Sequence, residues 1–208
     1  IANITAELLG IHHDKVSVLI GDTATIGYSN LTGGSRVLFA SAMVVTESAK
    51  IVIKQLKQRA AKIWGIDEEA IEWENGEARP AGDNAGKFAP LALAELAEKA
   101  TATGGPIGAG YQVNTEGAEG GFATHICDVE VDMDLGIVRV KRYTSVQDVG
   151  KAIHPDYVEG QLHGGCVQGI GWALSEEYIY NKDGHLDNTG FLDYRMPVCS
   201  DLPMLDTV

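Results

Sequence analysis

A glycine-rich helix between Asp148 and Glu177 is the feature that most restricts how this chain can fold. The helix is expected to begin near Pro155, a favourable first-turn residue. Apolar residues recur at every fourth position, which is the spacing of one helix face: Val158, Leu162, Cys166, Ile170 and Leu174. The same segment holds Gly160, Gly164, Gly165, Gly169 and Gly171. Because each interior glycine costs about 1 kcal/mol relative to alanine, something must approach this backbone closely.

Two interpretations explain such a helix. The first is tight packing of the helix on a sheet, a common use of glycine. The second is a flat or bulky ligand lying along the glycine face, beside the amide groups of Gln161 and Gln168. Periodicity alone leaves both open.

A second, longer helix is predicted from about residue 38 to residue 63. Its apolar residues step by threes and fours over about seven turns: Leu38, Ala42, Val45, Ala49, Val52, Leu56, Ala60 and Ile63. A polar, glycine-rich loop over residues 21–36 precedes it. Thr32 and Ser35 lie where a helix N-cap is expected, and the N–H groups after Gly33 and Gly34 could meet an anion. An ordinary cap is the alternative.

The charge balance excludes several classes of partner. The chain has 16 Lys and Arg against 29 Asp and Glu, a net charge of -13, which repels nucleic acids and anionic membranes. No apolar run approaches the length of a membrane span. Three cysteines without a C-x-x-C pattern favour buried free thiols in a reducing, cytoplasmic compartment over disulfides or a thiolate metal cluster.

The order of elements predicts an α+β fold with mixed sheets and helices packed on one side. Besides the two helices above, we expect helices at 3–9 and 90–100, strands at 16–20, 71–74, 111–113 and 178–180, a hairpin of 123–132 with 137–146, and an extended segment at 188–197. Lobes at 1–80 and 81–208 are one possible division. The chain lacks an initiator methionine and closes on a strand-like Leu205-Asp206-Thr207-Val208, so we expect a fragment of a longer subunit.

Two groups of polar residues are not expected to form functional sites. His12 and His13 are adjacent, and side chains of adjacent residues in an extended segment point to opposite sides. With Asp14 they are therefore not expected to share a metal ion. Glu159, Glu176 and Glu177 are interpreted as solvated surface acids.

The glycine helix nevertheless carries a specific resemblance. Asp148-Val149-Gly150, Ile153-His154-Pro155, the run Gly160-Gln161-Leu162-His163-Gly164-Gly165 and Gln168-Gly169-Ile170-Gly171 resemble the signature of the molybdenum-binding subunit of the xanthine dehydrogenase and aldehyde oxidase family. The turn at 32–36 and the string Tyr194-Arg195-Met196-Pro197 are similar to that family as well. The resemblance covers essentially the whole chain.

This resemblance implies a molybdenum-cofactor-binding domain of the xanthine dehydrogenase type. The cofactor would be molybdopterin, often the cytosine dinucleotide form in bacteria, whose dithiolene holds the molybdenum without a protein ligand. Thr32, Gly33, Gly34, Ser35 and Gln161 are the positions carried over as cofactor contacts, whereas Val37 stands where some relatives have a hydroxyl. No catalytic residue is carried over, because the glutamate of the family lies beyond residue 208 and its Gly-Gln-Gly-type loop lies before residue 1.

The implied activity is hydroxylation of an aldehyde or a purine-like N-heterocycle with oxygen derived from water. Electrons would leave through [2Fe-2S] clusters and FAD on partner domains or subunits. The alternative is a non-catalytic assembly module that retains the fold without the metal. A nicotinamide dehydrogenase ranks third, because the chain has no G-x-G-x-x-G fingerprint.

Overall fold

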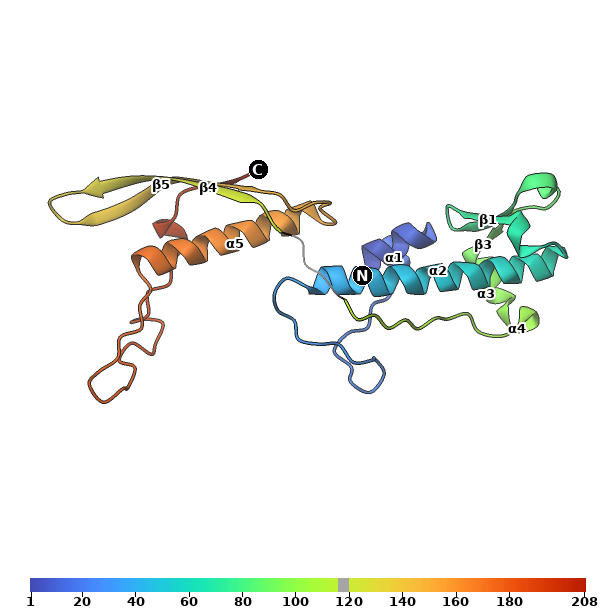
Figure 1. Cartoon of the computed structure of the whole chain (residues 1–208), viewed down its shortest axis with the longest axis horizontal. Coiled ribbons are helices and arrows are strands. Elements are labelled where there is room, and N and C mark those ends of the chain that lie inside the picture. Colours follow the sequence, from blue (N-terminus) through green and yellow to red (C-terminus); the bar gives the residue numbers. More distant parts are fainter. Residues whose placement is uncertain (116–119) are drawn as a thin grey trace. The chain divides into compact units, whose positions relative to one another are not determined.

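The computed structural model describes residues 1–115 and 120–208 and consists of two compact units, Ile1–Gly117 and Ala118–Val208 (Figure 1). Each unit is described by itself. The division falls later than the one considered at residue 80, because residues 71–103 pack against the long helix that precedes them. Part of the loop expected at 103–121 lies outside the described residues.

The first unit is built on the long helix α2, Val37–Trp64, as predicted. The other elements, in chain order, are α1 (Ala2–Leu9), the 3-10 turn η1 (His13–Lys15), η2 (Glu68–Ala70), β1 (Ile71–Glu74), β2 (Glu77–Pro80), η3 (Gly82–Asn84), β3 (Leu91–Ala92), α3 (Leu93–Glu98) and α4 (Ala100–Thr103). The antiparallel sheet β1-β2-β3 packs on the C-terminal half of α2. Their shared core consists of the buried residues Leu56, Ala60, Ile71, Ala78, Leu91 and Leu96.

The end of α1 fits closely onto the turn of the β1–β2 hairpin. Asn75 and Gly76 form that turn with φ values of 51° and 80°, the left-handed pair of a tight hairpin. Gly10 ends α1 at φ 70°, and a Cβ there would lie 2.7 Å from the carbonyl carbon of Asn75. The indole N–H of Trp73 donates to the carbonyl of Leu9 at 3.1 Å. α1 is therefore anchored by a glycine contact and one side-chain hydrogen bond.

The second unit contains a three-stranded sheet and the glycine helix. Its elements are β4 (Ala123–Asp132), β5 (Ile137–Gln147), α5 (Pro155–Leu174), η4 (Cys199–Asp201) and β6 (Leu205–Thr207). The order β4-β5-β6 combines an antiparallel hairpin with a parallel pair, so this sheet is mixed. α5 contacts β5 and β6 and lies on one side of the sheet (Figure 1). The predicted α+β class, the hairpin and both principal helices are confirmed.

Five local predictions are wrong, because a partner strand is missing, a turn forms instead, or the residues pair with another strand. Residues 16–20 and 111–113 are not strands, since no neighbouring strand pairs with them among the described residues. Only a single bridge, Tyr180 to Leu186, forms where a strand was expected at 178–180. Residues 190–194 turn instead of extending, with Tyr194 N–H bonded to the Gly190 carbonyl at 2.8 Å.

The fifth is the helix expected at 90–100, which is divided among β3, α3 and α4. Residues 91–92 pair with β2, and α3 starts only at Leu93. There the Glu95 carboxylate accepts from the Ala92 N–H at 2.9 Å. The cysteine prediction is also only partly right: all three thiols are free, but Cys166 alone is buried while Cys127 and Cys199 are exposed. In the part of the chain that the structure describes, no helix is long and apolar enough to cross a membrane.

Candidate functional site

The glycine-rich turn ahead of α2 has a different geometry from the predicted N-cap. Gly34 and Ser35 are both left-handed, with φ values of 66° and 56°. An N-cap side chain works from an extended backbone, so Ser35 cannot act as one. Arg36 occupies the cap position without a side-chain hydrogen bond to the helix. The prediction that Thr32 or Ser35 caps α2 is therefore wrong.

The same geometry leaves hydrogen-bond donors free at the start of α2. The first helical bond runs from the Ala40 N–H to the Arg36 carbonyl at 2.9 Å. The N–H groups of residues 37–39 and the hydroxyls of Thr32 and Ser35 find no acceptor among the described residues. The guanidinium of Arg36 braces the turn by donating to the Leu31 carbonyl at 3.4 Å. An exposed cluster of donors at a helix N-terminus suits an anionic ligand.

A second candidate surface, within the second unit, is one face of α5. A Cβ added at Gly160, Gly164, Gly165 or Gly169 would meet nothing within 4 Å in the described chain. Gln161 and Gln168 lie on this side, seven residues and so about two turns apart, and both are exposed. The opposite side buries Cys166 and Ile170. Within the second unit, four of the five glycines therefore form an open, amide-bearing face that close packing in this unit does not explain.

Gly171 is the exception, because close packing does explain it. A Cβ at Gly171 would overlap the carboxylate of Glu176 and lie 2.8 Å from Cδ of Pro197. Glu176 folds back there, its N–H bonded to the Gly171 carbonyl at 2.8 Å and its carboxylate accepting from the Tyr194 hydroxyl at 2.7 Å. Glu176 was expected to be a solvated acid, and this is wrong: it ties the 194–197 segment to the end of α5. Glu159 and Glu177 are exposed, as expected.

The Glu176 link predicts a specific pH dependence. The hydrogen bond from the Tyr194 hydroxyl to the Glu176 carboxylate, together with partial burial, raises the pKa of Tyr194 to about 12. The ordinary value is about 10. Because the pKa of Tyr194 is higher in the folded chain, the neutral hydroxyl stabilises the fold fully below pH ~10, the pKa of an unfolded tyrosine. This stabilisation is lost as the pH rises through the pKa of the folded chain, about 12. We expect the urea midpoint to fall between pH 10 and 12, with a smaller fall in Tyr194→Phe. Tyr28→Phe, a change at an exposed tyrosine, is the matched control; equal slopes in all three proteins would contradict the link.

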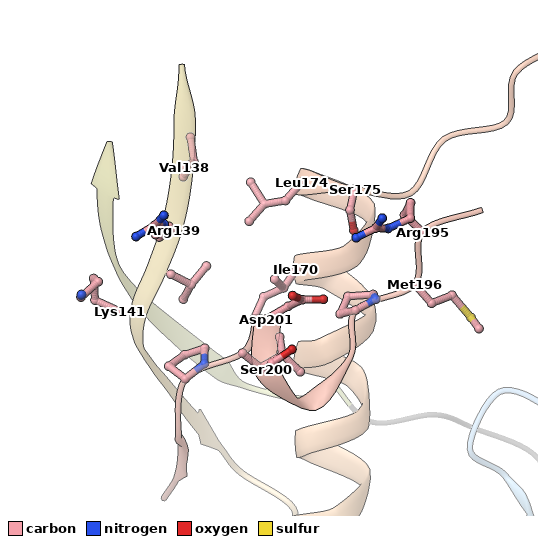
Figure 2. A pocket seen from close by; sticks show the side chains of 14 residues that line it. Val138, Arg139, Lys141, Ile170, Leu174, Ser175, Arg195, Met196, Ser200 and Asp201 are labelled. Carbon is pink, nitrogen blue, oxygen red and sulfur yellow. The ribbon is translucent and has the colours of Figure 1, made fainter. Parts of the chain in front are cut away.

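A separate cavity of about 720 Å³ lies within the second unit, between β5, the end of α5 and residues 195–203 (Figure 2). Arg139, Lys141 and Arg195 stand on its walls, and Asp201 lies inside. Lys141 is paired with Glu130 at 3.1 Å, and Asp201 accepts from the Val198 N–H at 3.0 Å. None of the predicted cofactor contacts lines this cavity.

The predicted site residues thus fall into two groups. Thr32, Gly33, Gly34 and Ser35 form one turn in the first unit, and Gln161 lies on α5 in the second. The anchoring of Glu176 by Tyr194 was not predicted from the sequence. The signal for it was present, because the Tyr-Arg-x-Pro string follows the helix.

The histidine pair also differs from expectation. His13 begins the 3-10 turn η1, so the chain bends directly after His12 instead of extending. The two rings consequently lie close together, with centroids 4.3 Å apart and their planes tilted by 34°. The expectation that these side chains point to opposite sides is wrong.

Residues 1–203 match the family described as the molybdopterin cofactor-binding domain. The large subunit of nicotine 6-hydroxylase from Paenarthrobacter nicotinovorans is 32% identical over 205 residues, covering 95% of this chain and 25% of the relative. A putative xanthine dehydrogenase molybdenum-binding subunit of Escherichia coli is 40% identical over 105 residues, 50% of this chain and 14% of the relative. The solved CO dehydrogenase from Oligotropha carboxidovorans superposes with a TM-score of 0.89 at 25% identity, covering 99% of this chain and 26% of that one.

The chain belongs to the molybdopterin cofactor-binding domain family. Within that family its relatives are large subunits of molybdenum hydroxylases, which confirms the resemblance seen in the sequence. The chain spans about a quarter of the length of the relatives that it matches along its whole length.

Proposed function

We propose that this chain is part of a molybdenum hydroxylase and binds molybdopterin. Each unit contributes one contact surface: the turn at 32–36 in the first unit and the open glycine face of α5 in the second. The observation that carries the proposal is the open face itself. Four interior glycines each cost α5 about 1 kcal/mol, and no packing within the second unit accounts for them. The family match over residues 1–203 supports a flat, hydrogen-bonding cofactor as its occupant.

The residues present fit such a group. Molybdopterin is a polyanion with many hydrogen-bonding atoms, and the turn offers hydroxyls and helix N-terminal N–H groups without internal acceptors. Gln161 offers both a donor and an acceptor from a carboxamide. The absence of a Cβ at Gly164 and Gly165 lets a flat ring system approach the α5 backbone. In the turn, Gly34 adopts a left-handed backbone with φ 66°, and a Cβ at Gly33 would lie 2.6 Å from Cδ1 of Leu31.

When bound, the cofactor supplies oxidation of a substrate carbon with oxygen derived from water, and the protein supplies binding and orientation. The contribution of this chain is to fix the cofactor by donors and to hold its position by the α5 face. We assign no proton transfer to any residue of this chain.

The proposed reaction class is hydroxylation of an aldehyde or an N-heterocycle. The relative named nicotine 6-hydroxylase supports the heterocycle, and the one named xanthine dehydrogenase supports a purine-like substrate. Both relatives are named as subunits. We accordingly propose that the remainder of the large subunit, a [2Fe-2S] protein and a flavoprotein complete the enzyme, with the cytosine dinucleotide as one form of the cofactor.

The test is cofactor retention by the complete subunit carrying Gln161→Ala. Loss of hydrogen bonds to a charged group costs about 1.5–3 kcal/mol, so we expect cofactor affinity to fall roughly 10- to 150-fold. Molybdenum per subunit after dialysis, and pterin fluorescence after oxidation, measure the loss. Gln58→Ala, at a half-buried glutamine of α2 outside the proposed site, is the control. Unchanged retention both in Gln161→Ala and in a Thr32→Ala/Ser35→Ala double variant would refute the proposal.

A further inference from the structure

We propose that His12, His13 and Asp14 form a binding site for one divalent transition-metal ion of the Zn²⁺ or Ni²⁺ class. The site lies in the turn between α1 and the following loop. It is independent of the cofactor surfaces, because none of its residues belongs to the turn at 32–36 or to α5.

The bend at η1 brings the three side chains together. Asp14 reaches both rings, with Oδ2 3.2 Å from Nδ1 of His12 and Oδ1 3.2 Å from Nε2 of His13. One ligand atom from each residue can be chosen so that all three lie within 4.8 Å of one another. With metal–ligand bonds of about 2.1 Å, two ligands on a tetrahedral ion stand roughly 3.4 Å apart. The spacing found here therefore needs only small side-chain adjustments to enclose an ion.

The backbone below the site is held in place. The Lys15 N–H bonds to the His12 carbonyl and the Val16 N–H to the His13 carbonyl, each at 3.0 Å. Just before the turn, the Ile11 N–H returns to the Ala6 carbonyl at 3.0 Å, and Gly10 packs against the β1–β2 turn. A turn fixed at both ends presents its side chains from one place, which lowers the ordering cost of binding an ion.

The donor set determines the class of ion. The two imidazoles are borderline ligands that favour Zn²⁺, Ni²⁺ or Cu²⁺, and these ions also accept the harder carboxylate oxygen, whereas Mg²⁺ prefers an all-oxygen shell. The side chains of His12, His13 and Asp14 are 65%, 58% and 74% exposed. Water would complete the shell, so ions should enter and leave readily.

Ion pairs between protonated imidazoles of His12 and His13 and the Asp14 carboxylate would give the same nitrogen–oxygen distances. That arrangement binds no metal ion, so metal titration separates the two. The exposed thiols Cys127 and Cys199 could also attract Zn²⁺ or Ni²⁺. The titration is therefore made on the full chain with both changed to serine.

Isothermal titration with Ni²⁺ and with Zn²⁺ should show one ion per chain. His12→Ala and His13→Ala should each weaken binding at least tenfold, and Asp14→Asn several-fold, whereas His185→Ala, an exposed histidine of the second unit, should leave binding unchanged. Mg²⁺ should not compete. Thermal unfolding of each variant checks that the fold is intact, which the exposure of these residues leads us to expect. Wild-type affinity in both histidine variants, or equal affinity for Mg²⁺, would overturn the proposal.

Discussion

Alanine at Gly164, Gly165 and Gly169 together is expected to stabilise the isolated chain and to abolish cofactor retention in the complete subunit. The stabilisation arises because a Cβ at these positions meets nothing within 4 Å, while each helical Gly→Ala change gains about 0.5–1 kcal/mol. The free energy of unfolding of the second unit should thus rise by about 1.5–3 kcal/mol. Three methyl groups on the open face would prevent a flat ligand from reaching the backbone.

The matched control lies on the same helix. Gly171→Ala would overlap the Glu176 carboxylate and crowd Pro197, so the second unit should lose about 1–3 kcal/mol of stability through overpacking. Urea unfolding followed by far-UV circular dichroism measures both variants, and molybdenum analysis of the complete subunit measures retention. Full cofactor retention in the triple variant would show that the open face does not contact the cofactor. Destabilisation by the triple variant would show that α5 is packed differently.

Gly10→Ala should strongly destabilise the first unit. Gly10 has a φ of 70°, where a residue with a Cβ costs about 1–2 kcal/mol. Its Cβ would also lie 2.7 and 2.8 Å from backbone atoms of Asn75, in the hairpin turn, and a further 1–3 kcal/mol is typical of such crowding. The expected loss is about 2–5 kcal/mol.

Gly65→Ala separates the two causes. Gly65 ends α2 with φ 68° and ψ 36°, nearly the values of Gly10, but nothing lies within 4 Å of its missing Cβ. It should show the φ cost alone, about 1–2 kcal/mol. Urea unfolding followed by tryptophan fluorescence reports on this unit through Trp73, whose indole bonds to α1. Equal losses in the two variants would mean that α1 does not rest on the hairpin turn.

Elements that carry their own signal were predictable from sequence. α2 shows an apolar repeat over about seven turns, and the Asn75-Gly76 pair selects a tight turn through its left-handed preference. The errors fall where structure depends on distant partners. Residues 16–20 are apolar enough for a strand, yet Leu19 and Ile20 are 63% and 73% exposed and pair with nothing in the described chain.

The assignment of Gln161 and the 32–35 turn as cofactor contacts stays a prediction from motif spacing. The geometry of the turn could not be predicted, because the left-handed backbone of Ser35, which removes the expected cap, is decided by how the whole loop enters α2. The sequence alone could not separate a packed from an open glycine face, because both interpretations explain the same residues. Within the second unit, the structure shows Gly171 packed and the other four glycines on an open face.

Native mass spectrometry of the protein isolated from its own source tests the central claim most directly. We expect this chain to be isolated as part of a larger assembly whose mass includes a molybdopterin. When the complex is dissociated, the molybdopterin should be released together with molybdenum. A bare species of 22.2 kDa that carries neither pterin nor molybdenum would contradict it, and would favour a non-catalytic assembly module that keeps the fold.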